Sequence, residues 1–182
     1  MGASVRPKLV VTYDVKGALG TKNGRKWANL PSQDWVILSR PEWTGLLPRG
    51  EVRVDPTWSP SEDVTKKVLR HFYPPTENTE LKTNRFETLA IHARVESIEH
   101  GIARARLEGR MRMKHPFYHK DDSNFVEAEI VGYLGFNIAT REITSLRLVT
   151  ENGRYGGDGN GVQHFGAAGR LIGKAGTANG SR

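Results

Sequence analysis

The feature that most constrains the fold is a strict alternation of apolar and charged residues in the middle of the chain. Between positions 103 and 114 every second residue is charged, and the residues between them are Ala, Leu, Gly or Met. The charged set consists of Arg104, Arg106, Glu108, Arg110, Arg112 and Lys114. Because successive side chains of a β-strand point to opposite faces, the pattern predicts a strand with one buried and one solvent-facing side.

Three further segments with the same alternation flank this strand. They begin near Leu89, Phe125 and Ile143, and only short connections separate them. Short connections favour antiparallel neighbours, so the sequence predicts a four-stranded meander as the core sheet of residues 85–150. The fold class is therefore mainly β in an α+β sense, with a curved antiparallel sheet or partial barrel.

Two glycines and one helix complete this prediction. Gly109 and Gly132 interrupt long strands and predict bends or bulges in the sheet. Residues 61–72 predict the one flanking helix, because apolar residues recur there at helical spacing and Pro74-Pro75 follows. The apolar residues are Val64, Val68, Leu69 and Phe72.

Composition sets the domain organisation and excludes some classes of site. The length fits a single β-rich domain over residues 1–172, followed by a disordered Gly-rich tail at 173–182. The sequence contains no run of 18 apolar residues, so it predicts no membrane-spanning helix. The chain has no cysteine, which excludes disulfides, thiolate zinc sites and cysteine nucleophiles. No motif identifies a cofactor, and catalytic activity stays open.

The net charge of +7 is unevenly distributed, since residues 100–120 hold six Lys or Arg and one Glu. We call the cations of the alternating segment the basic stripe; they are Arg104, Arg106, Arg110, Arg112 and Lys114. Such a row could follow the phosphates of a nucleic acid. Two observations favour a solvated face instead. Acidic residues on the flanking segments, such as Glu127 and Glu129, could form cross-strand ion pairs, and no aromatic residue interleaves the stripe.

The segment MRMKHPFYHK raises the possibility of a metal site. Its thioether and imidazole groups, from Met111, Met113, His115 and His119, suit copper better than zinc. In an extended strand, residues four apart lie about 13 Å from each other, too far for the two histidines to share an ion. A helical turn at Pro116 would make them neighbours. Core methionines and histidines at a strand end are the favoured interpretation.

The remaining candidates concern ligand binding and catalysis. Tryptophans and a tyrosine at positions 27, 35, 43, 58 and 73 could line a pocket at the mouth of the curved sheet, or fill the core. The sequence predicts a ligand site from Trp35, Trp58, Met111, Met113, His115 and Tyr133. A general base could come from His71, His92, His100 or His164, although no nucleophile motif accompanies them. The GGDGNG segment at 156–161 lacks the features of a phosphate or calcium loop and predicts a turn.

Four motifs resemble an uncharacterised bacterial domain of planctomycete-type organisms. They are HFYPPTEN (71–78), MKHPFYHKDD (113–122), VEAEIVGYLGF (126–136) and SLRLVTE (145–151). The resemblance covers roughly residues 58–170 and implies a place in secreted or periplasmic proteins rather than cytoplasmic ones. It implies no assigned activity and transfers no catalytic residue.

Three functions follow as expectations. The first is a non-catalytic binding or interaction domain, with an apolar small molecule or a partner protein in the concave face of the sheet. The second is an enzyme or metal-binding protein that uses His115 and His119. The third is nucleic-acid binding through the basic stripe.

Overall fold

The computed structural model describes residues 8–14, 33–73, 81–117, 120–157 and 161–172. This part of the chain is mainly β, as predicted. The strands are β1 (Lys8–Asp14), β2 (Gln33–Ile37), β3 (Thr57–Trp58), β4 (Arg85–Glu99), β5 (Ile102–Phe117), β6 (Lys120–Asn137), β7 (Ile143–Gly157), β8 (Gly161–His164) and β9 (Gly166–Ile172). The helices are α1 (Arg40–Thr44), α2 (Glu62–Leu69) and the short 3₁₀ helices η1 (Arg70–Phe72) and η2 (Leu81–Thr83).

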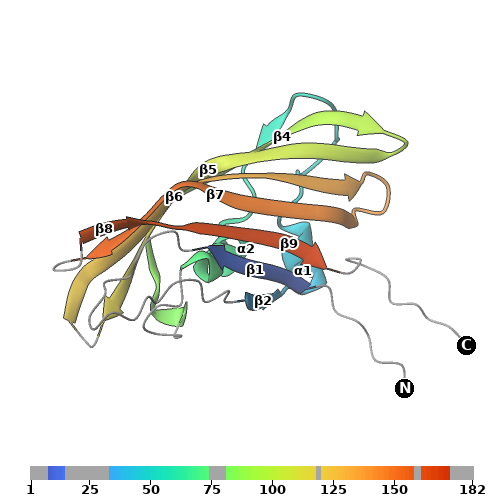
Figure 1. The fold of residues 1–182 in the computed structure, drawn as a ribbon. Helices are drawn as coiled ribbons and strands as arrows, with labels where there is room; N and C mark the ends of the chain where they lie inside the picture. Colours follow the sequence, from blue (N-terminus) through green and yellow to red (C-terminus); the bar gives the residue numbers. More distant parts are fainter. Residues whose placement is uncertain (1–7, 15–32, 74–80, 118–119, 158–160, 173–182) are drawn as a thin grey trace, which may run out of the picture.

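The described strands form one antiparallel sheet that does not close into a barrel (Figure 1). Its order is β2-β1-β9-β7-β6-β5-β4-β3, and β8 pairs with β7 outside this path. Strands β4 to β7 form the predicted meander. The sheet continues beyond it because β9 pairs with both β7 and β1. The first and last described strands therefore lie side by side, a pairing that the sequence patterns did not indicate.

The alternation along β5 separates a buried side of the sheet, the inner face, from an outer face. The buried residues of this strand are Ala103, Ala105, Leu107, Met111 and Met113, each at most 4% exposed. Helix α2 packs against the inner face with Val64, Val68 and Leu69, and Phe72 of η1 is fully buried in the same core. The helix predicted over residues 61–72 is thus α2 together with η1.

Gly109 and Gly132 do not mark bulges, which were one of the two features predicted for them. Gly109 is paired regularly with Ile91 and Ile130, whereas the register shifts lie at other positions, such as between Val95 and Ser97. A Cβ atom built at Gly109 would lie 2.8 Å from the Cα of Ile91. The glycine is therefore needed because the backbone of β4 approaches closely.

Helix α1 shows how a short helix forms in a proline-rich segment. Pro41 occupies its first turn, where the missing N–H costs nothing. The Glu42 carboxylate accepts a hydrogen bond from the Ser39 N–H at 2.6 Å. It also forms an ion pair with Lys67 of α2, whose Nζ lies 2.6 Å away. The hydrogen bond from Lys67, followed by that from Ser39, lowers the pKa of Glu42. One carboxylate thus caps α1 and ties it to α2.

Candidate functional site

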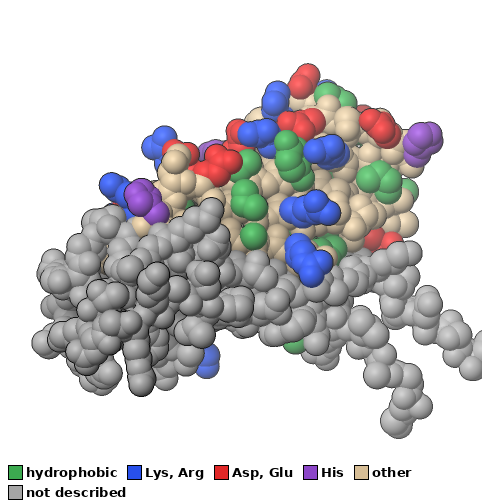
Figure 2. All heavy atoms as spheres, viewed as in Figure 1, with side chains coloured by type: hydrophobic (Ala, Val, Ile, Leu, Met, Phe, Trp, Pro, Cys, Tyr) green, Lys and Arg blue, Asp and Glu red, His purple; other side chains and the backbone are tan. Residues whose placement is uncertain are grey.

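The outer face of the sheet carries the basic stripe. Arg104 and Arg110 are exposed, while Arg106, Arg112 and Lys114 are half-buried among their neighbours. Figure 2 shows Lys and Arg side chains on the sheet face turned to the viewer, with acidic and hydrophobic side chains between them. The two ends of this face differ in how the cations are paired.

At one end, Arg112 and Arg154 share the carboxylate of Glu127. Arg112 Nη1 and Arg154 Nη2 both contact this carboxylate, and Arg154 Nε donates to it at 2.7 Å. Arg112 Nε also donates to Glu87 at 2.8 Å, and Lys114 Nζ lies 3.3 Å from the same carboxylate. We call these five residues the ion network. It confirms that cross-strand ion pairs absorb part of the stripe's charge.

The ion network shifts the titration of its two carboxylates. Hydrogen bonds from Arg154 and then from Arg112 lower the pKa of Glu127. A hydrogen bond from Arg112 is the main cause that lowers the pKa of Glu87. Both groups therefore stay ionised at neutral pH, and the cations between them are largely neutralised.

At the other end, arginines cross the sheet in a single row. Arg94 of β4 is paired with Arg106 of β5, which is paired with Tyr133 of β6. Tyr133 is paired with Arg147 of β7, which is paired with Arg170 of β9. We call these four arginines the arginine row. Neighbouring strands lie about 4.8 Å apart, so the row spans roughly 19 Å across five strands.

The arginine row is poor in carboxylate partners. Arg106 Nε donates to Glu108, and Arg94 Nη1 lies 4.0 Å from Asp55 at the edge of the sheet. Within the described ranges, Arg147 and Arg170 have no ion pair, and both are exposed. Positive charge is therefore left uncompensated over β7 and β9.

Tyr133 occupies the centre of the arginine row. The guanidinium carbon of Arg104 lies 4.3 Å from the centroid of its ring, and that of Arg106 lies 5.9 Å away. Arg106 Nη1 also donates to the phenol oxygen of Tyr133 at 3.2 Å. In the ion network, Arg112 lies 4.3 Å from the ring centroid of Phe125 in the same way.

Aromatic residues therefore do interleave the cations, and the expectation that they do not is wrong. They come from β6, so a search within the basic stripe alone could not find them. The alternation of β6 held the signal, because Phe125 and Tyr133 have the same parity as Glu127 and Glu129. Asn152 Nδ2 donates to Glu129 at 3.0 Å, and this carboxylate forms no ion pair with the stripe within the described part of the chain.

A shallow groove of about 470 Å³ lies over the middle of the outer face. Its polar lining includes Arg110, Arg112, Glu127, Glu129, Asn152 and Arg154. The volume is in the range of small-molecule sites, but the groove is open to solvent and most of its charges contact one another. It adjoins the ion network rather than the arginine row.

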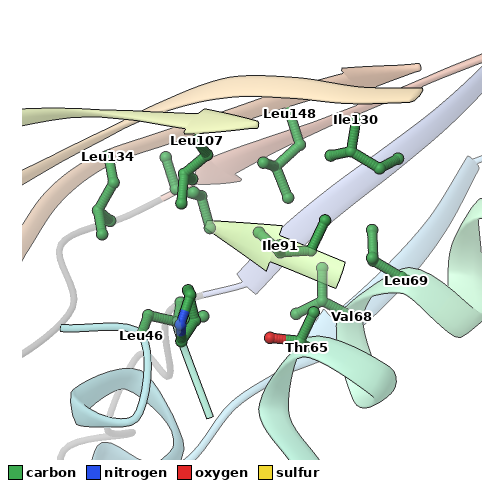
Figure 3. A pocket seen from close by; sticks show the side chains of 11 residues that line it. Leu46, Thr65, Val68, Leu69, Ile91, Leu107, Ile130, Leu134 and Leu148 are labelled. Carbon is green, nitrogen blue, oxygen red and sulfur yellow. The ribbon is translucent and has the colours of Figure 1, made fainter. Parts of the chain in front are cut away.

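Among the described residues, the inner face borders one small cavity. It lies between α2 and the sheet, where Val68 and Leu69 face Leu107, Ile130 and other apolar side chains (Figure 3). Its volume is about 30 Å³, enough for a water-sized molecule, whereas organic ligands need several hundred. Helix α2 packs against this side of the sheet, where the sequence predicted an apolar ligand.

The described side chains of the predicted ligand-binding residues do not lie together, and that of His115 lies outside the described part of the structure. Met111 and Met113 are buried in the core, while Tyr133 lies on the opposite face of the sheet. Trp58 is half-buried and donates its indole N–H to the Leu46 carbonyl at 3.0 Å, a structural role. Trp35 belongs to β2, and its side chain lies outside the described part of the structure.

The other aromatic candidates are core residues where they can be placed. Trp43 is 5% exposed, and Tyr73 packs edge-on against Tyr155 with ring centroids 6.1 Å apart. Trp27 and the predicted tail at 173–182 lie outside the described residues.

The proposed metal pair loses its geometric support. Strand β5 continues through Pro116 to Phe117, so the helical turn that would place His115 beside His119 does not form there. His119 itself lies outside the described residues. Among those that are described, no cluster of three or more His, Asp or Glu could hold a metal ion.

The four histidines considered as general bases lie in different elements of the described structure. His92 Nδ1 lies 3.2 Å from the hydroxyl of Ser59, and His92 is paired across the strands with Glu108. Glu108, however, accepts its hydrogen bond from Arg106, and both Ser59 and His92 are exposed. His100 lies in the β4–β5 turn, His71 in η1 and His164 in β8. The predicted turn at 156–161 connects β7 to β8, and its residues 158–160 lie outside the described part.

Comparisons with known proteins do not add to this geometry. No helix in the described residues is long and apolar enough to cross a membrane. Searches of the chain against protein-family models, curated proteins and solved structures found no match.

Proposed function

We propose that this chain is a non-catalytic binding domain that holds a polyanion on the outer face of its sheet. The arginine row is the observation that carries the proposal, because its four arginines occupy one line of paired positions across the sheet, with Tyr133 between them. Guanidinium groups match phosphate and carboxylate geometry with two parallel hydrogen bonds. A linear array of such groups suits a linear polyanion better than it suits a single small anion.

The distribution of charge separates this proposal from a face that only keeps the sheet soluble. A solubilising face mixes both signs along each row, as Arg112, Glu127 and Arg154 do in the ion network. The arginine row contains no carboxylate. Its members on β7 and β9, Arg147 and Arg170, have no ion-pair partner within the described ranges. Keeping like charges together without compensation is unfavourable for folding alone, which supports a binding role.

The inner cavity supports an apolar ligand less well. A volume of about 30 Å³ would have to expand roughly tenfold to accept an organic ligand of ordinary size. Such an expansion would separate α2 from the sheet and expose core residues such as Leu69 and Phe72. The outer face needs no rearrangement to accept a polyanion.

Binding of an abasic single-stranded oligomer, which has phosphates and sugars but no bases, tests the proposal. With four phosphate contacts, the log–log slope of affinity against salt should be about −3, a loss of roughly fifty-fold between about 50 and 200 mM salt. Fluorescence anisotropy of a labelled oligomer measures both values.

Two matched charge reversals locate the binding surface. Arg147→Glu removes one member of the arginine row and should weaken binding about tenfold and flatten the salt slope by about 1. Arg40→Glu makes the same charge change on the exposed side of α1 and should have little effect. Equal effects of the two variants would show a response to net charge only. An absence of binding at the lowest salt would refute the proposal.

A further inference from the structure

The arginine row has an aromatic ring at its centre, and this feature identifies the class of polyanion. Arg94 and Arg106 lie on one side of Tyr133, and Arg147 and Arg170 lie on the other. We infer that the occupant is a single-stranded nucleic acid that crosses the strands along the row and stacks one base on Tyr133. This inference rests on the proposed function and names its partner.

Tyr133 is prepared for stacking. The hydrogen bond from Arg106 holds the phenol at one edge, and the backbone of β6 pairs on both sides, so the ring has little freedom to lose on binding. Arg104 covers the ring face at 4.3 Å from the centroid, the position that a base would take. Bases and guanidinium groups stack on aromatic rings in the same way.

Arg104 can leave that position at little cost. It is exposed and has no ion pair within the described part of the chain, so only the contact with Tyr133 positions its guanidinium. When a base takes its place, the freed guanidinium remains close enough to pair with an adjacent phosphate. The stack on Tyr133 is thus exchanged for an equivalent stack plus an additional charge-assisted hydrogen bond.

Phe125 provides an internal comparison on the same strand and face. It too lies under an arginine at 4.3 Å, but Arg112 is bonded to both Glu87 and Glu127. Displacing Arg112 would break two ion pairs, and the surrounding carboxylates would repel a phosphate. The two aromatic residues therefore differ in what covers them, and only Tyr133 is available to a base.

The same geometry disfavours other polyanions. A duplex keeps its bases stacked inside, and polyphosphate or a sulfated polysaccharide has no planar base to place on the ring. Those polymers could use the arginine row but would gain nothing from Tyr133. Dependence on this ring is consequently the signature of a single-stranded nucleic acid.

The test compares labelled oligo(dT) with an abasic oligomer of equal length by fluorescence anisotropy at low salt. The intact protein should bind oligo(dT) at least about fivefold more tightly, because one stacked base is worth that much or more. Tyr133→Leu should erase the difference, Tyr133→Phe should keep it, and Phe125→Leu should leave it unchanged. Circular dichroism and thermal melting check that each variant is folded.

The outcomes separate the two levels of the hypothesis. Equal affinity of the intact protein for oligo(dT) and the abasic oligomer would overturn the stacking inference and leave the polyanion proposal standing. An unchanged preference for oligo(dT) in a folded Tyr133→Leu variant would also overturn it. If neither oligomer binds, the proposed function itself fails. The comparison of the two oligomers needs no variant, so it remains decisive even if Tyr133→Leu does not fold.

Discussion

Replacing Leu107 by alanine tests the assignment of the two faces of β5. Leu107 is 4% exposed and lines the small inner cavity. The truncation removes three buried carbon groups at about 0.8 kcal/mol each, a transfer cost of roughly 2.4 kcal/mol. It also enlarges a cavity that the surrounding core already leaves unfilled. We expect a total loss of about 3 to 4 kcal/mol, within the range measured for buried leucines.

Urea unfolding followed by tryptophan fluorescence measures this loss. At ordinary urea sensitivities of about 1 to 3 kcal/mol per M, the midpoint should fall by roughly 1 to 4 M urea. Arg110→Ala, three residues away on the exposed side, should cost less than about 1 kcal/mol. Leu107→Asp should abolish folding, because it buries an unpaired charge. A Leu107→Ala variant as stable as Arg110→Ala, or a cooperatively melting Leu107→Asp variant, would refute the assignment of the faces.

Three other predictions concern the ion network, a close strand contact and the cavity. Because the pKa of Glu127 is lowered in the folded state, its stabilising effect is complete above the ordinary value of about 4.5 and disappears as the pH falls through the folded value. Glu127→Gln should therefore lose less stability than the intact protein between neutral and acid pH, whereas the control Glu151→Gln should follow the intact protein; equal losses would contradict this. Gly109→Ala should lower stability by about 1 to 3 kcal/mol in urea unfolding, since the new methyl group would collide with β4, and a neutral effect would show that β4 can move aside. Val68→Ile should raise stability by up to about 0.8 kcal/mol by filling the inner cavity, and a lower melting temperature would mean that the cavity is too small for a methyl group.

The sequence predicted those parts of the fold that have a local signature. Alternation along β5 is a property of neighbouring residues, so both the strand and its buried side followed from it. The helix ending near Phe72 was equally local, because its spacing and the prolines after it are visible in one window. The pairing of β1 with β9 has no such signature, since it joins segments more than 150 residues apart. Helix α1 was missed although Ser39 and Glu42 form a recognisable capping pair.

The candidate site was harder to predict because it depends on register. The basic stripe lies along one strand. The arginine row takes one residue from each of four strands, and Tyr133 comes from a fifth strand between them. Bulges also shift which residues meet: the shift between Phe86 and Thr88 accompanies the pairing of Glu87 with Arg112. Only the aligned sheet shows that one end of the face is neutralised and the other is not.

The most direct test of the central claim is a titration of isotopically labelled protein with an abasic oligomer, monitored by amide chemical shifts. The outer-face account predicts that the shifted amides cluster around the arginine row, at Arg106, Tyr133, Arg147 and Arg170, while those of α2 stay in place. Shifts centred instead on α2 and the inner cavity, for example at Val68 and Leu107, would contradict it and return the binding site to the concave side of the sheet.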